Sequence, residues 1–426
     1  MSDKRGLLAI SPLLVFIAVY LVTSIVAGDF YKVPISVAFM ISSIYAVSIA
    51  GGNSLRSNID IFSKGASASN IMLMLWIFIL AGAFASSAKA IGSVDATVNM
   101  MLSVLPDSMV LPGLFLATCF ISLSIGTSVG TIVALVPIAA GLAASTGANT
   151  ALMTAVVVGG AFFGDNLSFI SDTTIAATSS QGCKMSDKFR VNFFITLPAA
   201  IVILALYTFL GFEMSPTIDR HGVDVLKVLP YIAVLVTAIA GLNVLSVLVI
   251  GLILTGLIGI LSGSLDIYGW FHTMGDGILS MGELIIITML AGGVFEIIRH
   301  KGGIDYLISK ISSRIHGKRG AEFVIGFMVA IIDVCTANNT VAIISTGGIA
   351  KQIGKRFNLD NRKIASLLDT CSCCAQGVIP YGAQMLMASG LTHLNPLQIM
   401  PYLFYPMALS VCVLLSIIFR FPKRYS

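Results

Sequence analysis

Long apolar runs alternate with short polar segments along almost the whole chain. A helix needs about 20 apolar residues to cross the hydrocarbon core of a bilayer. The pattern predicts ten spans, at 7–27, 33–51, 70–88, 150–180, 191–212, 228–243, 244–262, 281–299, 363–390 and 398–420. No convincing small-residue cleavage site ends the first run, so we expect it to be a spanning helix rather than a signal peptide.

Two further apolar stretches, 109–146 and 321–350, are interrupted midway by small polar residues. The interruptions read "SLSIGTSVGT" at 122–131 and "CTANNT" at 335–340. We expect two re-entrant hairpins whose tips meet at membrane depth; two ordinary pairs of kinked helices are the alternative. Irregular backbone at that depth is tolerated only where protein or a watery cavity satisfies it, which makes the tips candidate binding elements.

The chain also resembles itself at a nearly constant spacing. "ILAG" at 79–82 matches "MLAGG" at 289–293, about 210 residues later, and the polar breaks follow at a similar spacing. "FFGDNLS" at 162–168 matches "SLLDTCS" at 366–372, which places Asp369 opposite Asp165 if a short deletion has occurred.

These matches divide the chain into two repeats, 1–213 and 228–426. The first has scaffold spans within 7–88, the hairpin 109–146, a broken span 150–180 and a span 191–212; the second has scaffold spans within 228–299, the hairpin 321–350, a broken span 363–390 and a span 398–420. Five spans per repeat is an odd number, so the halves are inverted. The predicted fold class is an all-α integral membrane protein with two inverted-topology repeats, each with five spans and one re-entrant hairpin, a plan typical of secondary transporters.

Composition supports this fold class. Of 426 residues, 57% are hydrophobic and only 11% are charged, whereas a soluble domain has about 25% charged residues. The net charge is +5, but no basic patch interleaved with aromatics is present, which argues against nucleic-acid binding. The cluster Cys371, Cys373 and Cys374 is read as packing residues, with a soft-metal site as the alternative.

The charges also predict an orientation. With the N-terminus inside, 21 of the 25 Lys and Arg residues fall in cytoplasmic loops, Lys188 and Lys363 among them. Both termini are then cytoplasmic, in the inner cell membrane. This assignment leaves no Lys or Arg in the core of the protein.

A polar stretch inside a predicted span is the first candidate site. A carboxylate in hydrocarbon costs ~3 kcal/mol on some scales, so it usually faces a partner or a watery path. Asp165 and Asp172 are seven residues apart, which would place them on one face of an intact helix. Asn166, Ser168 and Thr173 add further oxygen atoms, as suits a hard cation or a polar substrate. Hydroxyl groups that bond only to their own helix are the alternative.

Further polar residues complete the candidate set: Thr127 and Ser128 at the first tip, Asn338, Asn339 and Thr340 at the second tip, and Asp369, Thr370 and Ser372 in the second repeat. Asp333 precedes the second tip and is either a proton carrier or an internal partner. The sequence has no nucleotide-binding loop, nucleophile elbow or histidine cluster. We therefore expect a transporter driven by an ion gradient, with no cofactor, rather than an enzyme.

Two motifs carry a family resemblance. "SIGTSVGTIVALVPIA" at 124–139 and "GDNLSFISDTTIAATSSQG" at 164–182 resemble signatures of NhaC-type sodium/proton antiporters, and "ANNT" at 337–340 is similar to hairpin tips of the broader ion-transporter superfamily. The resemblance implies a scaffold domain and a moving transport domain, often in homodimers with elevator motion. The "FIS" before Asp172 departs from the Pro-containing form common in that family.

Two functions remain open at this stage. The first is sodium/proton exchange, in which Asp172, with Asp165 nearby, binds sodium when ionised and a proton when neutral. The second is sodium- or proton-coupled transport of a small organic anion or amino acid. A carboxylate substrate would favour positive charge at the site, and the absence of Lys and Arg from the predicted core favours the cation.

The orientation can be tested by labelling. In a cysteine-free background, a cysteine placed at His316 or Arg356 should be protected from a membrane-impermeant thiol reagent in intact cells, because both positions lie in predicted cytoplasmic loops. Labelling of either position from outside would contradict the topology.

Overall fold

The computed structural model describes residues 3–27, 34–51, 54–104, 106–169, 171–213, 224–312, 315 and 317–425, and the regular structure in these ranges is helical throughout. The first half contains α1 (Asp3–Ala27), α2 (Ile35–Ile49), α3 (Leu55–Ala66), α4 (Ser69–Ala90), α5 (Ser93–Val104), η1 (Asp107–Met109), α6 (Val110–Ile125), α7 (Ser128–Thr146), α8 (Thr150–Leu167), α9 (Asp172–Gln181) and α10 (Met185–Glu213).

The second half contains α11 (Val225–Ile239), α12 (Val244–Leu261), α13 (Ile267–Ser280), α14 (Gly282–His300), α15 (Gly303–Ser312), α16 (Gly317–Thr336), α17 (Asn339–Phe357), α18 (Asn361–Gln376), α19 (Ala383–Thr392), α20 (Pro396–Ile399), η2 (Met400–Tyr402), α21 (Phe404–Ile418) and η3 (Lys423–Tyr425).

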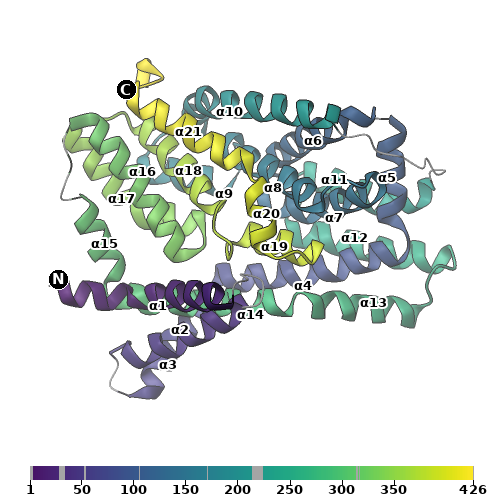
Figure 1. Cartoon of the computed structure of the whole chain (residues 1–426), viewed down its shortest axis with the longest axis horizontal. Coiled ribbons are helices and arrows are strands. Elements are labelled where there is room, and N and C mark those ends of the chain that lie inside the picture. Colours follow the sequence, from purple (N-terminus) through teal and green to yellow (C-terminus); the bar gives the residue numbers. More distant parts are fainter. Residues whose placement is uncertain are drawn as a thin grey trace.

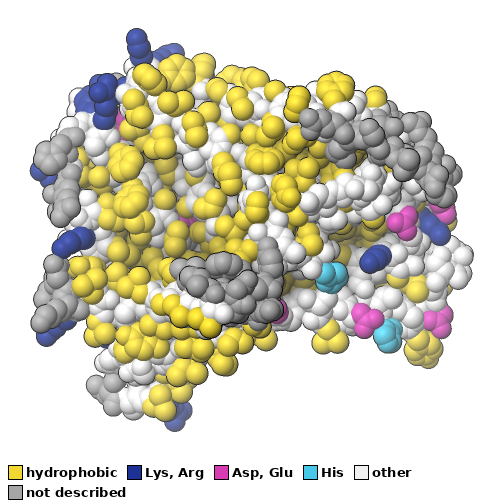
Figure 2. Space-filling model, viewed as in Figure 1, with side chains coloured by type: hydrophobic (Ala, Val, Ile, Leu, Met, Phe, Trp, Pro, Cys, Tyr) yellow, Lys and Arg dark blue, Asp and Glu magenta, His cyan; other side chains and the backbone are white. Residues whose placement is uncertain are grey.

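Helix length and surface chemistry suit a bilayer. Within the described residues, five helices are long and apolar enough to cross it: Ile71–Ala90, Ser128–Thr146, Thr150–Gln181, Met185–Phe212 and Val244–Leu261. Two bent helix pairs raise this number to seven; the expected ten spans also count shorter apolar helices, and that number stays a prediction. Figure 2 shows hydrophobic side chains across the middle of one face, with charged side chains mostly toward its left and right ends. Helix α1 begins and η3 ends toward the left end of the molecule (Figure 1).

The two halves repeat the same helix boundaries. Helices α17, α18 and α19 each begin 211 residues after α7, α8 and α9, at Asn339 against Ser128, Asn361 against Thr150, and Ala383 against Asp172. The left-handed residues that follow helices have the same spacing: Gly126 and Ala337, Gly147 and Asn358, and Gly182 and His393. At this spacing of 211 residues, the repeat position equivalent to Asp369 is Val158. The sequence-based alignment paired Asp369 with Asp165 at a spacing of 204, and the helix boundaries do not agree with that pairing.

Two close crossings hold α3 and α4 against α14 and α13. A Cβ atom on Gly277 of α13 would lie 2.1 Å from the carbonyl oxygen of Gly82 on α4, and one on Gly82 would lie 2.2 Å from that of Gly277. A Cβ atom on Gly65 of α3 would likewise lie 2.4 Å from the carbonyl oxygen of Gly292 on α14. Small residues let membrane helices approach this closely. We call α3, α4, α13 and α14 the glycine-crossed block.

The remaining helices exchange partners between the halves. Helix α9 packs against α17, and α19 packs against α7. We call α8–α9 and α18–α19 the interrupted segments, and α6–α7 and α16–α17 the helix pairs. The second helix of each interrupted segment thus packs against the helix pair of the other half: α9 against α16–α17, and α19 against α6–α7. Figure 1 shows α7, α8, α19 and α20 close to the centre of the view, and residues 151–167 of α8 are almost all buried. The interruptions follow these buried helices, although Phe169 in the first and Val378 in the second are exposed.

The glycine crossing predicts a difference between two glycines on one helix. Gly277→Ala should lower the melting temperature of the detergent-solubilised protein, because overpacking costs about 1–3 kcal/mol. Gly275→Ala is the matched control, since a Cβ atom there would have nothing within 4 Å, and it should be neutral or slightly stabilising. Equal melting temperatures for the two variants would contradict the close crossing.

Candidate functional site

Both helix-pair turns line one partly open cavity of about 470 Å³. Ten of its eleven polar lining residues come from the turn between α6 and α7, the turn between α16 and α17, and both interrupted segments: Thr127, Ser128, Asp165, Asp172, Thr173, Asn338, Asn339, Thr340, Gln376 and Gln384; the eleventh is Asn243. Residues of α4 and of the connection between α11 and α12 complete the wall. Eight of these ten polar residues are predicted from the sequence.

Asp165 is the most enclosed carboxylate of this lining. It lies near the end of α8 and is 4% exposed. The backbone N–H of Ser128, at the first turn of α7, donates to its Oδ1 atom at 3.0 Å. The N-terminal end of a helix carries partial positive charge, so this position favours the anionic carboxylate. Close packing of α7 and α8 holds the pair together.

Asp172 lies across the interruption in the same segment. Helix α8 ends at Leu167 and α9 begins at Asp172, with the Ser171 side chain accepting from the backbone N–H of Thr174 as the N-cap. The interruption brings Asp172 and Thr173 to the cavity wall at the first turn of α9. Asp172 is exposed, whereas Asp165 is buried, so the two carboxylates share a cavity but differ in their contact with solvent.

The second half contributes amides instead of carboxylates. Asn338 caps α17 by accepting from the backbone N–H of Val341. The Nε2 atom of Gln376 donates to Oε1 of Gln384 at 2.9 Å, and Nε2 of Gln384 donates to Oγ of Ser128 at 3.0 Å. This chain of hydrogen bonds connects the second interrupted segment to the first turn of α7. Two buried atoms on the wall have no partner among the described residues: Nδ2 of Asn339 and Oε1 of Gln376.

Gln376 and Gln384 were missed by the sequence analysis. They lie 211 residues after Asp165 and Thr173, at the spacing that also relates Asn339 to Ser128. Alignment of the repeats at that single spacing would have found both glutamines. The chemical likeness of Asp369 to Asp165 favoured the spacing of 204 instead.

Six predicted site residues lie away from the cavity wall, and Asp333 is one of them. Thr370 and Ser372 donate to the carbonyl oxygens of Ser366 and Asp369 in their own helix. Ser168 donates to the carbonyl oxygen of Leu123. The other two, Asn166 and Asp369, are fully buried and bind a lysine behind the wall.

That lysine corrects an expectation. Lys188 and Lys363 were assigned to cytoplasmic loops, and the core was expected to have no Lys or Arg. Both side chains are 0% exposed. Lys188 forms a 2.8 Å ion pair with Asp369, and Lys363 donates to Ser416 and to the carbonyl oxygen of Phe421. Both lie near the start of their helices, where the sequence alone did not separate a loop lysine from one that points inward.

Two further buried carboxylates form no ion pair within 4 Å among the described residues. Asp333, near the end of α16, is 0% exposed, and the backbone of Gln376 is its polar neighbour. Glu322, near the start of the same helix, is also 0% exposed, has the cation Lys363 in its surroundings, and was not predicted from the sequence. An unpaired buried charge is costly, so each group requires a proton, a cation or a water.

Oxygen atoms make the cavity suitable for a hard cation. Carboxylate, hydroxyl and amide oxygens from both halves line it, and these are the ligands that hard cations prefer. Within the described residues, no cluster of three or more His, Cys, Asp and Glu side chains could hold a metal ion, so the soft-metal alternative for the cysteines finds no support.

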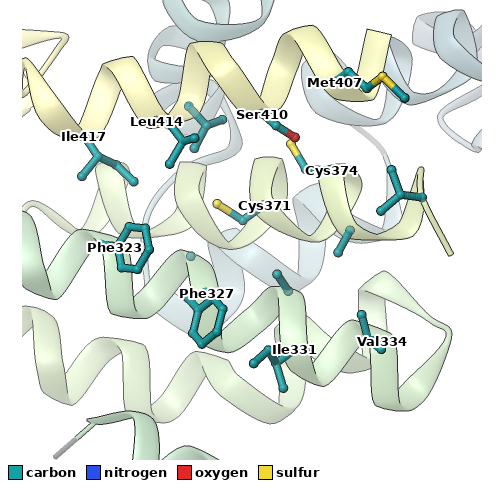
Figure 3. A pocket seen from close by; sticks show the side chains of 15 residues that line it. Phe323, Phe327, Ile331, Val334, Cys371, Cys374, Met407, Ser410, Leu414 and Ile417 are labelled. Carbon is teal, nitrogen blue, oxygen red and sulfur yellow. The ribbon is translucent and has the colours of Figure 1, made fainter. Parts of the chain in front are cut away.

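A second hollow, of about 600 Å³, has different chemistry. It lies between α16, α18 and α21 (Figure 3). Phe323, Phe327, Ile331 and Leu414 project into it, together with the sulfur atoms of Cys371 and Cys374 from α18. The lining is almost wholly apolar, so this hollow is not a site for ions.

The fold is that of a multi-pass, all-α integral membrane protein, and oxygen atoms from both halves line its cavity. The sequence model of the Na⁺/H⁺ antiporter family matches residues 6–212 and 216–422. The chain therefore belongs to this family, and membership points to a transporter rather than an enzyme.

Curated relatives of similar sequence have several transport activities. The chain is 23% identical to the Na⁺/H⁺ antiporter NhaC of Alkalihalophilus pseudofirmus, over 58% of this chain and 61% of that protein. It is 21% identical to the malate-2H⁺/Na⁺-lactate antiporter of Bacillus subtilis, over 100% of this chain and 97% of that protein. The arginine/ornithine antiporter ArcD of Halobacterium salinarum is 22% identical over 58% of each chain. The YdaH transporter of Alcanivorax borkumensis has 12% identity and a TM-score of 0.42 over 85% of this chain and 88% of that one, too low to define a shared arrangement.

The contact between Ser128 and Asp165 can be tested with two substitutions. Ser128→Pro removes the N–H that Asp165 accepts, yet proline is favoured at the first position of a helix, and the extended Thr127 before it (φ −145°, ψ 123°) is compatible with it. A hydrogen bond to a charged group contributes about 1.5–3 kcal/mol. If sodium binds at Asp165, it should stabilise this variant against heating only at concentrations about tenfold or more higher than for the wild type.

Ser128→Ala is the matched control, because it keeps the N–H and removes the hydroxyl. It removes a neutral hydroxyl from the cavity wall, so it should raise the required sodium concentration less than Ser128→Pro does. If proline and alanine have the same effect, the N–H does not support Asp165.

Proposed function

We propose that this protein is a sodium/proton antiporter that exchanges the two ions at the cavity between its two helix-pair turns. The observation that carries the proposal is Asp165, a buried carboxylate at the cavity wall held by the first turn of α7. This carboxylate has a hydrogen bond but no counter-ion among the described residues, and a buried charge without a counter-ion is costly, so a cation or a proton would complete it. Exchange follows if sodium and the proton cannot occupy the same oxygens together.

We assign the main role to Asp165 and a second ligand role to Asp172. The sequence favoured the reverse order, because Asp172 lies within the most family-like motif. Their exposures argue for the change: a carboxylate shielded from water depends on its ligand for its charge, whereas exposed Asp172 keeps solvent contact. Thr127, Ser128 and Thr173, with Asn338, Asn339 and Thr340, would supply the remaining oxygens. Asp333, fully buried and without a counter-ion among the described residues, is proposed as a separate proton carrier.

Gradients provide enough free energy for this cycle. A tenfold concentration gradient corresponds to about 1.4 kcal/mol, and a 100 mV potential adds about 2.3 kcal/mol per charge moved. We propose an elevator-type movement of the helix pairs and interrupted segments, in one piece, against the glycine-crossed block. The close glycine contacts support a rigid block, and the partner exchange between α9 and α17 and between α19 and α7 supports a single moving body.

The wider arrangement is proposed with it. The two matched segments of the family model begin at residues 6 and 216, a spacing of 210, close to the spacing of the helix boundaries. This agreement supports two inverted repeats. We propose a homodimer in the inner cell membrane with both termini in the cytoplasm.

One observation favours a second candidate, sodium-coupled transport of a small organic anion. Helices α7, α9, α17 and α19 all begin at the cavity, and helix N-terminal ends attract carboxylates. The unpaired Nδ2 atom of Asn339 is a free donor on the same wall. The malate/lactate relative matches the full length of the chain.

One assay tests both candidates. In proteoliposomes that contain a pH-sensitive dye, a sodium gradient should drive proton flux in the wild type without any metabolite. Asp165→Asn should abolish this flux, and Asp172→Asn should raise the sodium KM. The control Asp60→Asn removes an exposed carboxylate on α3 and should change neither.

The contrary outcomes are specific. Near wild-type exchange by Asp165→Asn would show that the assignment is wrong. Flux that appears only when one member of a panel of carboxylates and amino acids is added would replace the first candidate with the second.

A further inference from the structure

The interruption between α8 and α9 frees the carbonyl groups of three buried residues, Asp165, Asn166 and Ser168. In a bilayer such groups must find partners within the protein. Ser171 donates its hydroxyl to the carbonyl oxygen of Asp165 at 3.0 Å, and Thr174 donates to that of Ser168 at 2.8 Å. The carbonyl oxygen of Asn166 accepts from a helix outside the segment, α10.

Lys188 of α10 supplies that donor. Its ammonium group contacts three oxygens: the carbonyl of Asn166 at 2.8 Å, Oγ1 of Thr174 at 2.6 Å and Oδ2 of Asp369 at 2.8 Å. An ammonium group has three N–H donors, so the three contacts use all of them. Lys188 is therefore a fully bonded, fixed cation that connects both pieces of the interrupted segment to α18.

Asn192, one turn along α10, duplicates two of these contacts. Its Nδ2 atom donates to the carbonyl oxygen of Asn166 at 2.7 Å and to Oδ2 of Asp369 at 2.8 Å. The same Asp369 oxygen is thus bound by a lysine and an amide. The carboxylate already has an internal counter-ion, unlike Asp165 and Asp172.

The residues that Lys188 binds are direct chain neighbours of the cavity wall. Asn166 follows Asp165, and Thr174 follows Thr173. Because only one peptide unit separates each pair, a movement of Asn166 also moves Asp165, and a movement of Thr174 also moves Thr173.

We propose that Lys188 is the positioning residue of the cation site. Its ammonium group withdraws Asp369 from ion exchange and fixes the interruption so that Asp165 and Thr173 face the cavity together. This inference rests on the proposed function, because it takes Asp165 as the exchanging carboxylate.

The pair should behave as a unit. Loss of one partner leaves an uncompensated buried charge, whereas loss of both leaves none. Lys188→Met and Asp369→Asn should each raise the sodium KM of proton flux about tenfold or more, because the interruption moves to solvate the charge left behind. Lys188→Met/Asp369→Asn should return the KM to within about threefold of the wild-type value, with Asn192 still bonding to the carbonyl of Asn166.

Lys363→Met is the matched control. Lys363 is also 0% exposed, but it binds Ser416 and the carbonyl oxygen of Phe421, away from the cavity wall. Its replacement should lower the melting temperature and leave the sodium KM unchanged. The melting temperature of every variant, measured without sodium, separates loss of folding from loss of positioning.

The outcomes distinguish this inference from the function on which it rests. A wild type without sodium-driven proton flux overturns both. If the wild type exchanges sodium, three results overturn the inference alone: single variants that lower only the melting temperature, a double variant worse than either single one, or a KM for Lys363→Met that rises as much as that for Lys188→Met. Recovery of the sodium KM in the double variant supports it.

Discussion

The structure depends on one constraint: a helix interrupted inside a bilayer must find protein partners for the backbone groups that it frees. At the first interruption, those partners are two hydroxyls of the segment itself and the side chains of Lys188 and Asn192. The hydrogen bonds let the chain turn at membrane depth. The same turn brings Asp165 and Asp172 to one cavity. The hydrogen bonds that satisfy the freed backbone groups therefore also position the two carboxylates.

Much of the fold could be predicted because hydrophobic runs and polar breaks report directly on the bilayer. The breaks near Thr127 and Asn338 are turns between helices in the structure, at residues 126–127 and 337–338. The spacing of the halves was harder to read. Gly126, Gly147 and Gly182 each end a helix in a left-handed conformation, but Ala337, Asn358 and His393 do so in the second half. The second half keeps the left-handed backbone conformation at these positions but lacks the glycines from which it could be predicted.

The site was predicted less completely, for two physical reasons. Gln376 and Gln384 carry no charge that would distinguish them in sequence, so only the spacing of 211 residues pointed to their place on the cavity wall. Lys188 was hidden for the opposite reason. Positive charge near a helix start is typical of a cytoplasmic loop, and only its contacts with Asp369 and Asn166 reveal a core cation. Asp369 then changes from a candidate ligand to the partner of that lysine.

The repeated backbone and its unequal side chains argue for one site rather than two. Positions related by 211 residues face the same cavity, but the first half supplies the carboxylate Asp165 where the second supplies the amide Gln376, and Asp172 lies opposite Ala383. Two equivalent carboxylate sets in one cavity would repel each other strongly at low dielectric. Amides provide oxygen ligands without that repulsion. A duplicated frame can therefore surround a cation from both sides while only one half carries the charge that competes for it.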